Sequence, residues 1–213
     1  MKRTTHEGLE KLRHDFLNEH KDKDHVILFG ENKPFVLSAP HGVTQWREGK
    51  IKYAEPGTIN TALHLNKICN CHAIIKTKNN HDDANYDPTS EYKTALEKFI
   101  KENNIKYIID LHSLAPHRTC DINVGVAGGK LVETNPELYR KFVKMLHDAG
   151  FNVYIDVPFF GSPRTIAGSL KNKFEDIWTI QLEVNSKIAW YEEGFEKYKK
   201  LLDVLATFIV EIE

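Results

Sequence analysis

Residues 91–112 read EYKTALEKFIKENNIKYIIDLH, and this stretch decides the class of fold. Ser90 can cap a helix at its start, since apolar residues recur at helical spacing over positions 95–100. The helix is expected to end near Asn103, and the continuous apolar middle of residues 106–110 is typical of a buried strand. A helix that leads directly into a buried strand predicts a βαβ-type architecture, in which helices cover both faces of a mainly parallel sheet.

The same alternation extends along the rest of the chain. Apolar runs predict six further strands, over residues 25–29, 34–39, 73–76, 121–126, 152–157 and 177–184. Helical spacing predicts helices within the first 21 residues and over 58–70, 136–149 and 190–212. The polar stretch 79–90 is expected to be a loop. Because the chain shows no internal repeat and no linker, residues 1–213 are predicted to form a single α/β domain.

The composition is that of an ordinary globular protein without a strong electrostatic field. Of 213 residues, 41% are hydrophobic and 28% are charged, which allows a sizeable core. The 30 acidic residues nearly balance the 29 basic ones, so we expect no nucleic-acid or membrane partner. The most apolar late stretch, residues 204–210, is far shorter than the roughly 20 residues that span a bilayer.

The cellular location is predicted from the first residues and from the cysteines. The first 21 residues lack the apolar core of a signal peptide. Cys69, Cys71 and Cys120 make an odd number, so reduced thiols are a simpler interpretation than a disulfide framework. We therefore expect a cytoplasmic protein whose partner is a small-molecule substrate.

Histidines and carboxylates follow two of the predicted strands. One strand runs into Pro40-His41-Gly42, where the glycine leaves room for a ligand beside the histidine. Asp110 and His112 share one face of another strand, because side chains alternate with a period of two. In open α/β sheets, functional sites gather at the carboxyl ends of strands. Taken alone, each segment also has a structural interpretation without a function. His41 could be a loop histidine, and Asp110 and His112 could be the polar end of a surface strand.

A third strand end and a turn carry further carboxylates. Gln181, Glu183 and Asn185 project from one face of their strand, and such a row is costly to bury unless it faces a wet cleft. Glu55 lies in a Glu-Pro-Gly-Thr turn that leads into a helix. An exposed edge strand and an ordinary turn are the alternatives for these two segments.

Two histidines and one carboxylate match a catalytic zinc site that leaves one coordination position for water. His41, Glu55 and His112 can be the ligands, with Asp110 orienting His112. Bound zinc lowers the pKa of its water to about 7 and polarises a carbonyl group. Glu183 can then act as the general base and pass the proton to the leaving amine. Nickel, cobalt and manganese are alternative metals for such a ligand set.

Other site motifs are absent or incomplete. Residues 125–131 resemble a phosphate loop but lack the first glycine at the required spacing and a Ser or Thr after Lys130. No GxSxG nucleophile elbow and no HExxH zinc motif occur. Residues 69–72 read CNCH, but no second Cys/His pair completes a four-ligand set.

Five segments in order resemble the N-formylglutamate amidohydrolase family and, more distantly, phage poly-γ-glutamate hydrolases and zinc carboxypeptidases. They are Ser38-Ala-Pro-His41-Gly42, Glu55-Pro-Gly-Thr58, Asn85-Tyr-Asp87, Asp110-Leu-His112-Ser113 and Gln181-Leu-Glu183-Val-Asn185. Together they span residues 38–185, which is most of the chain.

The resemblance implies a three-layer αβα fold of the phosphorylase/hydrolase-like type and metal-assisted hydrolysis of an amide. By this similarity His41, Glu55 and His112 are metal ligands and Glu183 is the catalytic glutamate. Asp110 resembles an acid that contacts a ligand without binding the metal itself. Glu55 matches a His…Glu-Pro-Gly-Thr pattern of the poly-γ-glutamate hydrolases, although the spacing from the histidine is longer here.

One departure concerns the substrate. Family members often carry an arginine before an Asp-x-Asn-Arg segment in the middle of the chain, whereas residues 81–88 read HDDANYDP here, without arginine. Arg164 could recognise a substrate carboxylate in its place, since a guanidinium binds carboxylates in a bidentate manner. Asn85 and Asn185 are further candidates for orienting the substrate.

The sequence thus predicts a zinc-dependent amidohydrolase that acts on a small carboxylate-bearing substrate, such as an N-formyl or N-acyl amino acid. One alternative is a γ-glutamyl or cell-wall peptide hydrolase with the same metal centre. A second alternative, from another class, is a non-catalytic protein that keeps the fold and binds a ligand in the cleft.

Overall fold

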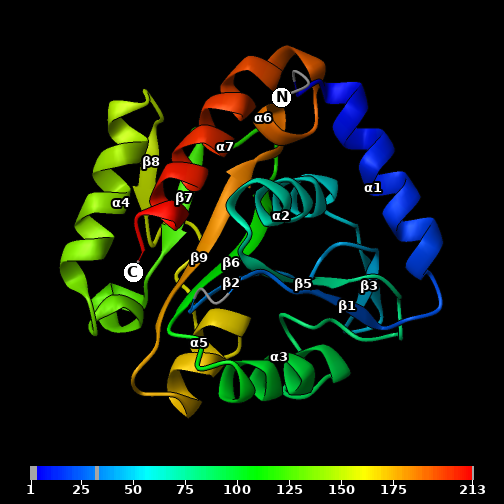
Figure 1. The fold of residues 1–213 in the computed structure, drawn as a ribbon. Helices are drawn as coiled ribbons and strands as arrows, with labels where there is room; N and C mark the ends of the chain where they lie inside the picture. Colours follow the sequence, from blue (N-terminus) through cyan, green and yellow to red (C-terminus); the bar gives the residue numbers. More distant parts are fainter. Residues whose placement is uncertain (1–3, 32–33, 213) are drawn as a thin grey trace.

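A seven-stranded sheet forms the middle of the molecule (Figure 1). The computed structural model describes residues 4–31 and 34–212, so the parts of the predictions that fall on residues 1–3, 32, 33 and 213 lie outside it. The strand order is β1-β5-β2-β6-β9-β7-β8. The strands of this sheet are β1 (His25–Leu28), β2 (Phe35–Ala39), β5 (His72–Lys76), β6 (Tyr107–Leu114), β7 (Ile122–Gly125), β8 (Val153–Ile155) and β9 (Trp178–Asn185).

The sheet is mixed but mainly parallel, as the sequence predicts. Strands β5, β2, β6 and β9 are parallel neighbours, and β8 runs parallel to β7. The antiparallel pairs are β1 with β5 and β7 with β9. The carboxyl ends of β2, β6 and β9 therefore lie side by side at one edge of the sheet.

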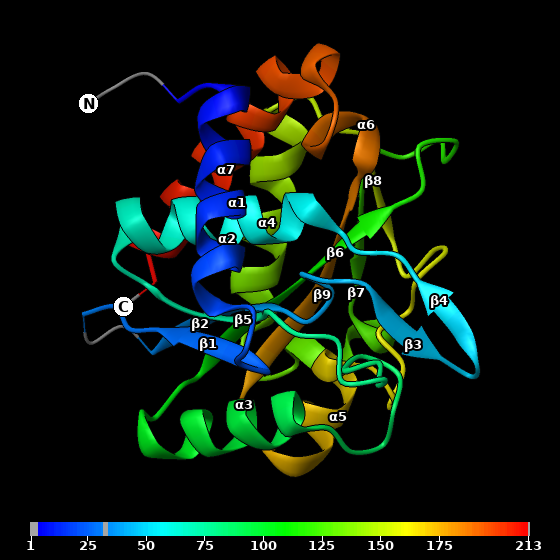
Figure 2. The ribbon, with the colours of Figure 1, turned by 90° about the vertical axis from the view of Figure 1, so that its right-hand side faces the viewer.

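Helices cover both faces of the sheet and complete a three-layer αβα fold (Figures 1 and 2). Helices α1, α2, α4 and α7 pack on one face and α3 and α5 on the other. No helix in the described ranges combines the length and the apolar character needed to cross a membrane. The helices are α1 (His6–His20), α2 (Pro56–Cys69), α3 (Glu91–Glu102), α4 (Pro136–Asp148), α5 (Ile166–Lys173), α6 (Ser186–Ala189) and α7 (Phe195–Val210), with two 3₁₀ turns, η1 (Ala127–Val132) and η2 (Glu192–Gly194).

The alternation of side chains along β6 and β9 separates the core from the polar face. Ile109 and Leu111 of β6 belong to the larger apolar cluster under α1, α2, α4 and α7. Ile108 faces the smaller cluster under α3 and α5. On that same face Asp110 and His112 follow toward the carboxyl end, so the polar residues begin where the smaller helical layer ends.

Several short elements and the start of the final helix differ from the sequence prediction. A small hairpin of β3 (Gln45–Arg47) and β4 (Lys50–Lys52) was not predicted, because three-residue strands are too short for a periodic signal. Helix α5 was also missed, since it has only eight residues and contains Gly168. The final helix, predicted from residue 190, begins at Phe195 after a short turn. A Cβ at Gly194 would lie 2.0 Å from the carbonyl oxygen of Lys187, so only glycine fits at this close approach to the end of α6.

The apolar stripe of α7 is core packing, and Phe208 tests it. Its ring lies 4.7 Å from that of Phe142 and 6.0 Å from that of Trp178. Phe208→Ala is expected to lower the free energy of unfolding by about 3–5 kcal/mol, because it leaves a cavity under the helix. Val210→Ala in the same helix is the control, since Val210 is 60% exposed. Equal urea midpoints for the two variants would contradict this packing.

Candidate metal centre

Three side chains from separate elements converge at the carboxyl edge of the sheet. His41 follows β2, Glu55 precedes α2 and His112 belongs to β6. One ligand atom from each residue lies within 4.8 Å of the other two, and all three side chains are buried. The structure thus brings together the three residues that the sequence predicts as metal ligands.

The backbone positions His41 and Glu55 relative to each other. Glu55 N–H donates to the carbonyl of His41 at 2.8 Å, which closes the segment between them into a loop. The residue after the histidine must be glycine, because a Cβ at Gly42 would lie 2.5 Å from the carbonyl oxygen of Lys76. Pro56 occupies the first turn of α2, where a missing N–H costs nothing.

The two Nδ1 atoms and the Glu55 carboxylate face one another. His41 Nδ1 lies 3.0 Å from Glu55 Oε1 and 3.2 Å from His112 Nδ1, and His112 Nδ1 lies 3.6 Å from Glu55 Oε2. Ligand atoms at about 2.0–2.1 Å from a tetrahedral zinc ion stand about 3.3 Å apart. The spacing and the donor types of this cluster therefore fit a zinc-type divalent ion.

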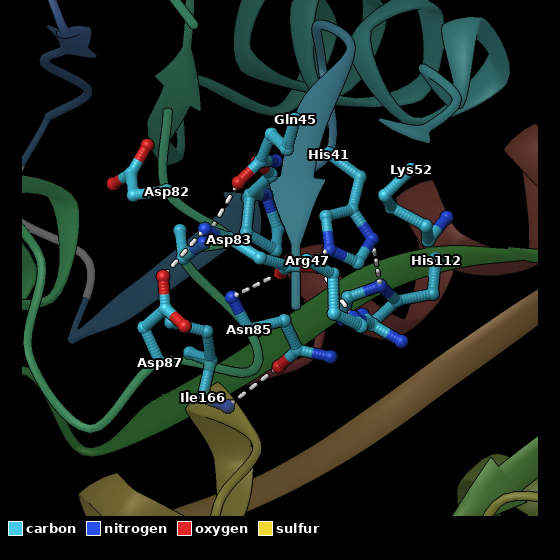
Figure 3. A network of polar contacts seen from close by, with 12 residues as sticks. His41, Gln45, Arg47, Lys52, Asp82, Asp83, Asn85, Asp87, His112 and Ile166 are labelled. Atoms are coloured by element: carbon cyan, nitrogen blue, oxygen red, sulfur yellow. Dashed lines mark hydrogen bonds and ion pairs between the residues drawn. The ribbon is translucent and has the colours of Figure 1, made fainter. Parts of the chain in front are cut away.

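In each candidate ligand histidine, the Nε2 atom contacts a buried carboxylate. His41 Nε2 lies 2.9 Å from Asp83 Oδ1, and His112 Nε2 lies 2.9 Å from Asp110 Oδ2. A carboxylate on Nε2 keeps the proton there and leaves the lone pair of Nδ1 for a metal, which is the usual support of metal-binding histidines. Figure 3 shows His41 and His112 within this polar network.

The charges of the cluster shift the pKa values of its members. Burial acts to raise the pKa of Glu55, but His41 and His112 together hold it well below its usual range. Burial acts to lower the pKa of His112, but Asp110, Glu55 and Glu183 together raise it well above that of a free imidazole, so a metal ion at Nδ1 would have to displace a proton. Glu55 is therefore ionised and ready to bind a cation.

Glu183 lies beside the cluster without belonging to it. It pairs with His112 across the parallel register of β6 and β9, and its side chain is buried. Gln181 Nε2 donates to Glu183 Oε1 at 2.6 Å, which fixes the carboxylate. Burial is the main cause that raises the pKa of Glu183. A carboxylate with a raised pKa near the candidate metal ligands suits proton transfer.

The other expected site residues lie in different surroundings. Asn185 caps α6 through Lys187 N–H, and its Nδ2 donates to the carbonyls of Arg118 and Cys120. Asn85 Oδ1 accepts the N–H of Ile166 at 2.7 Å and so anchors the start of α5. These amides hold segments of the chain in place, and a role in substrate binding stays a prediction.

Arg164 lies at the surface, and its side chain contacts Tyr86. It donates to the hydroxyl of Tyr86 at 3.2 Å, and its guanidinium carbon lies 5.4 Å from the centre of that ring. No hydrogen bond connects it with a metal-ligand candidate among the residues that the structure describes. Its role in carboxylate binding also stays a prediction.

Sequence reasoning missed three residues of the site. Asp83 lies in the loop 79–90, which was identified only as polar, and the Asp83-Ala-Asn85 spacing was the one signal that could have singled it out. Arg47 Nε donates to Asp83 Oδ2 at 2.7 Å, and the Lys52 ammonium pairs with Glu55. Arg47 and Lys52 belong to the hairpin that the sequence did not reveal.

Comparisons of sequence assign no family. No protein-family model matches the chain. The orotidine 5'-phosphate decarboxylase of Pasteurella multocida is 33% identical over 67 residues, which make up 31% of this chain and 27% of the decarboxylase. The match spans little more than a quarter of that protein's length, so it carries no conclusion about the whole chain.

Comparisons of structure support the fold. A gene product of Agrobacterium tumefaciens is 11% identical with a TM-score of 0.65, covering 95% of this chain and 100% of that one. A bacteriophage poly-γ-glutamate hydrolase is 15% identical with a TM-score of 0.54, covering 97% and 93%. A metallo-carboxypeptidase of Pseudomonas aeruginosa is 11% identical with a TM-score of 0.56, covering 99% and 70%. The chain therefore shares its three-layer αβα fold with these proteins, and membership of the N-formylglutamate amidohydrolase family stays a prediction.

The carboxylate behind His41 gives a test of the metal centre. Asp83→Asn is expected to weaken zinc binding by about 10–100-fold, since the ring loses the charge that fixes it. Asp82→Asn is the control, because its carboxylate pairs with Lys76 and not with a histidine. Competition with a chromogenic chelator measures both affinities. An equal loss in the two variants would show that Asp83 does not support a ligand.

Proposed function

We propose that this protein is a zinc-dependent amidohydrolase that cleaves an amide bond in a small carboxylate-bearing substrate, such as an N-formyl or N-acyl amino acid. The observation that carries the proposal is the convergence of two Nδ1 atoms and one carboxylate with Glu183 beside them. Two of the structural neighbours described above are, by their names, a hydrolase and a carboxypeptidase, which supports hydrolysis for this fold.

The residues have separate roles in the proposed reaction. His41, Glu55 and His112 would hold the zinc ion, which when bound polarises the substrate carbonyl and lowers the pKa of water. Asp83 and Asp110 keep both imidazole rings in the orientation that presents Nδ1. These five side chains thus build the centre and leave the proton transfers to another group.

Glu183 is the proposed general base and then the general acid. Its carboxylate takes the proton of the attacking water and returns it to the nitrogen of the leaving amine. Gln181 keeps this carboxylate in place through the hydrogen bond from its amide. The burial that raises the pKa of Glu183 also makes the protonated form accessible, so that the same group can complete both steps.

Substitution of Glu183 tests its role in the reaction. Glu183→Gln is expected to retain zinc and to lose at least about 100-fold in kcat, because a general base contributes 10²–10⁴-fold. Glu55→Gln is the matched variant, which should lose both the metal and the activity. Turnover by Glu183→Gln at the rate of the wild type would remove this residue from the mechanism.

A metal and substrate assay tests the function itself. We expect one zinc ion per chain by elemental analysis, loss of activity with a chelator and recovery with zinc. The substrate panel pairs N-formyl and N-acetyl amino acids with γ-glutamyl dipeptides, which separates the amidohydrolase from the alternative peptide hydrolase. A protein that binds no divalent metal and cleaves none of these compounds would instead be a non-catalytic binding protein.

A further inference from the structure

The hairpin β3–β4 carries two cationic side chains next to the metal centre. Arg47 is the last residue of β3 and Lys52 the last of β4. The register pairs Gln45 with Lys52 and Arg47 with Lys50, so these four side chains project from one face of the hairpin. Figure 3 shows Arg47 and Lys52 extending from the hairpin toward His41 and His112.

The hairpin is held firmly against the site. Gln45 donates to the carbonyl of Pro40, and its Oε1 accepts the N–H of Ala84 at 2.7 Å. Trp46 N–H donates to the carbonyl of Asp82 at 3.0 Å. These hydrogen bonds hold β3 against Pro40, which precedes His41, and against the loop that carries Asp83. The two cations on the hairpin therefore have a defined position.

Each cation contacts a carboxylate that also contacts a ligand histidine. Arg47 Nε donates to Asp83 Oδ2, and Asp83 Oδ1 lies 2.9 Å from His41 Nε2. The Lys52 ammonium pairs with Glu55, whose carboxylate faces both histidines. The positive charges thus lie directly outside the proposed metal site.

Both cations remain accessible from solvent, in contrast to the ligands. The side chain of Arg47 is 35% exposed and that of Lys52 is 28% exposed, whereas those of His41 and Glu55 are only 2% and 6% exposed. Asp83 takes only Nε of the Arg47 guanidinium, and the two Nη groups have no hydrogen-bond partner in the described part of the chain. Two parallel N–H donors of this kind match the two oxygens of a carboxylate.

A divalent cation held by His41, Glu55 and His112 would compete with Lys52 for the negative charge of Glu55. The Lys52 ammonium would then be available to another anion. The adjacent Tyr86 ring lies 5.0 Å from the guanidinium carbon of Arg47, which restricts the guanidinium on its other side.

We propose that Arg47 and Lys52 form the binding site for the carboxylate of the substrate, so that the hairpin rather than Arg164 selects anionic substrates. This inference rests on the proposed metallohydrolase function and adds the residues that determine its specificity. It assigns a substrate whose carboxylate lies close to the scissile amide, because both cations adjoin carboxylates that contact the metal ligands.

Succinate binding to the zinc-loaded protein tests the inference without turnover. Isothermal titration calorimetry is expected to show that Arg47→Gln and Lys52→Gln each weaken succinate binding by about tenfold or more, since each removes a charged hydrogen-bond donor. Lys50→Gln removes the same charge from the exposed end of the same hairpin and is expected to bind succinate as the wild type does. Succinamide, which is uncharged, should not distinguish the variants.

The outcomes separate this inference from the proposed function. Zinc content is measured for every variant, so a wild-type chain that takes up no metal contradicts the proposed function. Full zinc loading with unchanged succinate affinity in both variants, or no succinate binding by the wild type, overturns the inference alone. A tenfold loss in Arg164→Gln with none in Arg47→Gln also overturns it.

A second variant guards against loss of folding. Arg47→Lys keeps a positive charge beside Asp83 but removes the two parallel donors. We expect it to retain the circular dichroism spectrum and melting temperature of the wild type while losing affinity for succinate. Wild-type succinate affinity in this variant would show that the bidentate group plays no part.

Discussion

The burial of Asp83 and Asp110 behind the two histidines is the interaction on which the site depends. An ionised carboxylate is stable inside a protein only where charges and hydrogen bonds replace its water. Asp110 receives a hydrogen bond from Ser38 at 2.8 Å in addition to its contact with His112. Asp83 accepts from Arg47 and from the N–H of Asn85 as well as contacting His41. Each histidine is thus oriented by an acid that the fold itself must stabilise.

The placement of this network follows from the two unequal helical layers. The larger layer covers the full apolar face of β6 and β9, whereas α3 and α5 leave the carboxyl halves of the other face to polar groups. Lys93 of α3 is buried, and its ammonium donates to the carbonyls of Asp87 and Arg164 at 2.6 and 3.0 Å. One lysine therefore ties the loop bearing Asp83 to the segment that leads into α5.

The sequence predicted those features of the site that follow from local periodicity and from the order of strands and helices. Alternation placed Asp110 and His112 on one face, and the βαβ order placed the ends of β2, β6 and β9 at one edge. It could not supply the register that sets His112 opposite Glu183, because strand pairing is a long-range property. Asp83 and the hairpin residue Arg47 were missed for a related reason, since short strands and loops acquire their positions from tertiary contacts.

The segment between His41 and Glu55 connects the proposed metal site with the proposed carboxylate site. The hydrogen bond from Glu55 N–H to the carbonyl of His41 closes a loop whose ends carry two of the proposed ligands and whose middle is the hairpin. The hairpin thus takes up most of the interval of 14 positions between His41 and Glu55. Closing a longer loop adds only a small entropic cost, since that cost grows slowly with length. An inserted hairpin can thus place Arg47 and Lys52 over the centre while the closing hydrogen bond keeps the ligand positions unchanged.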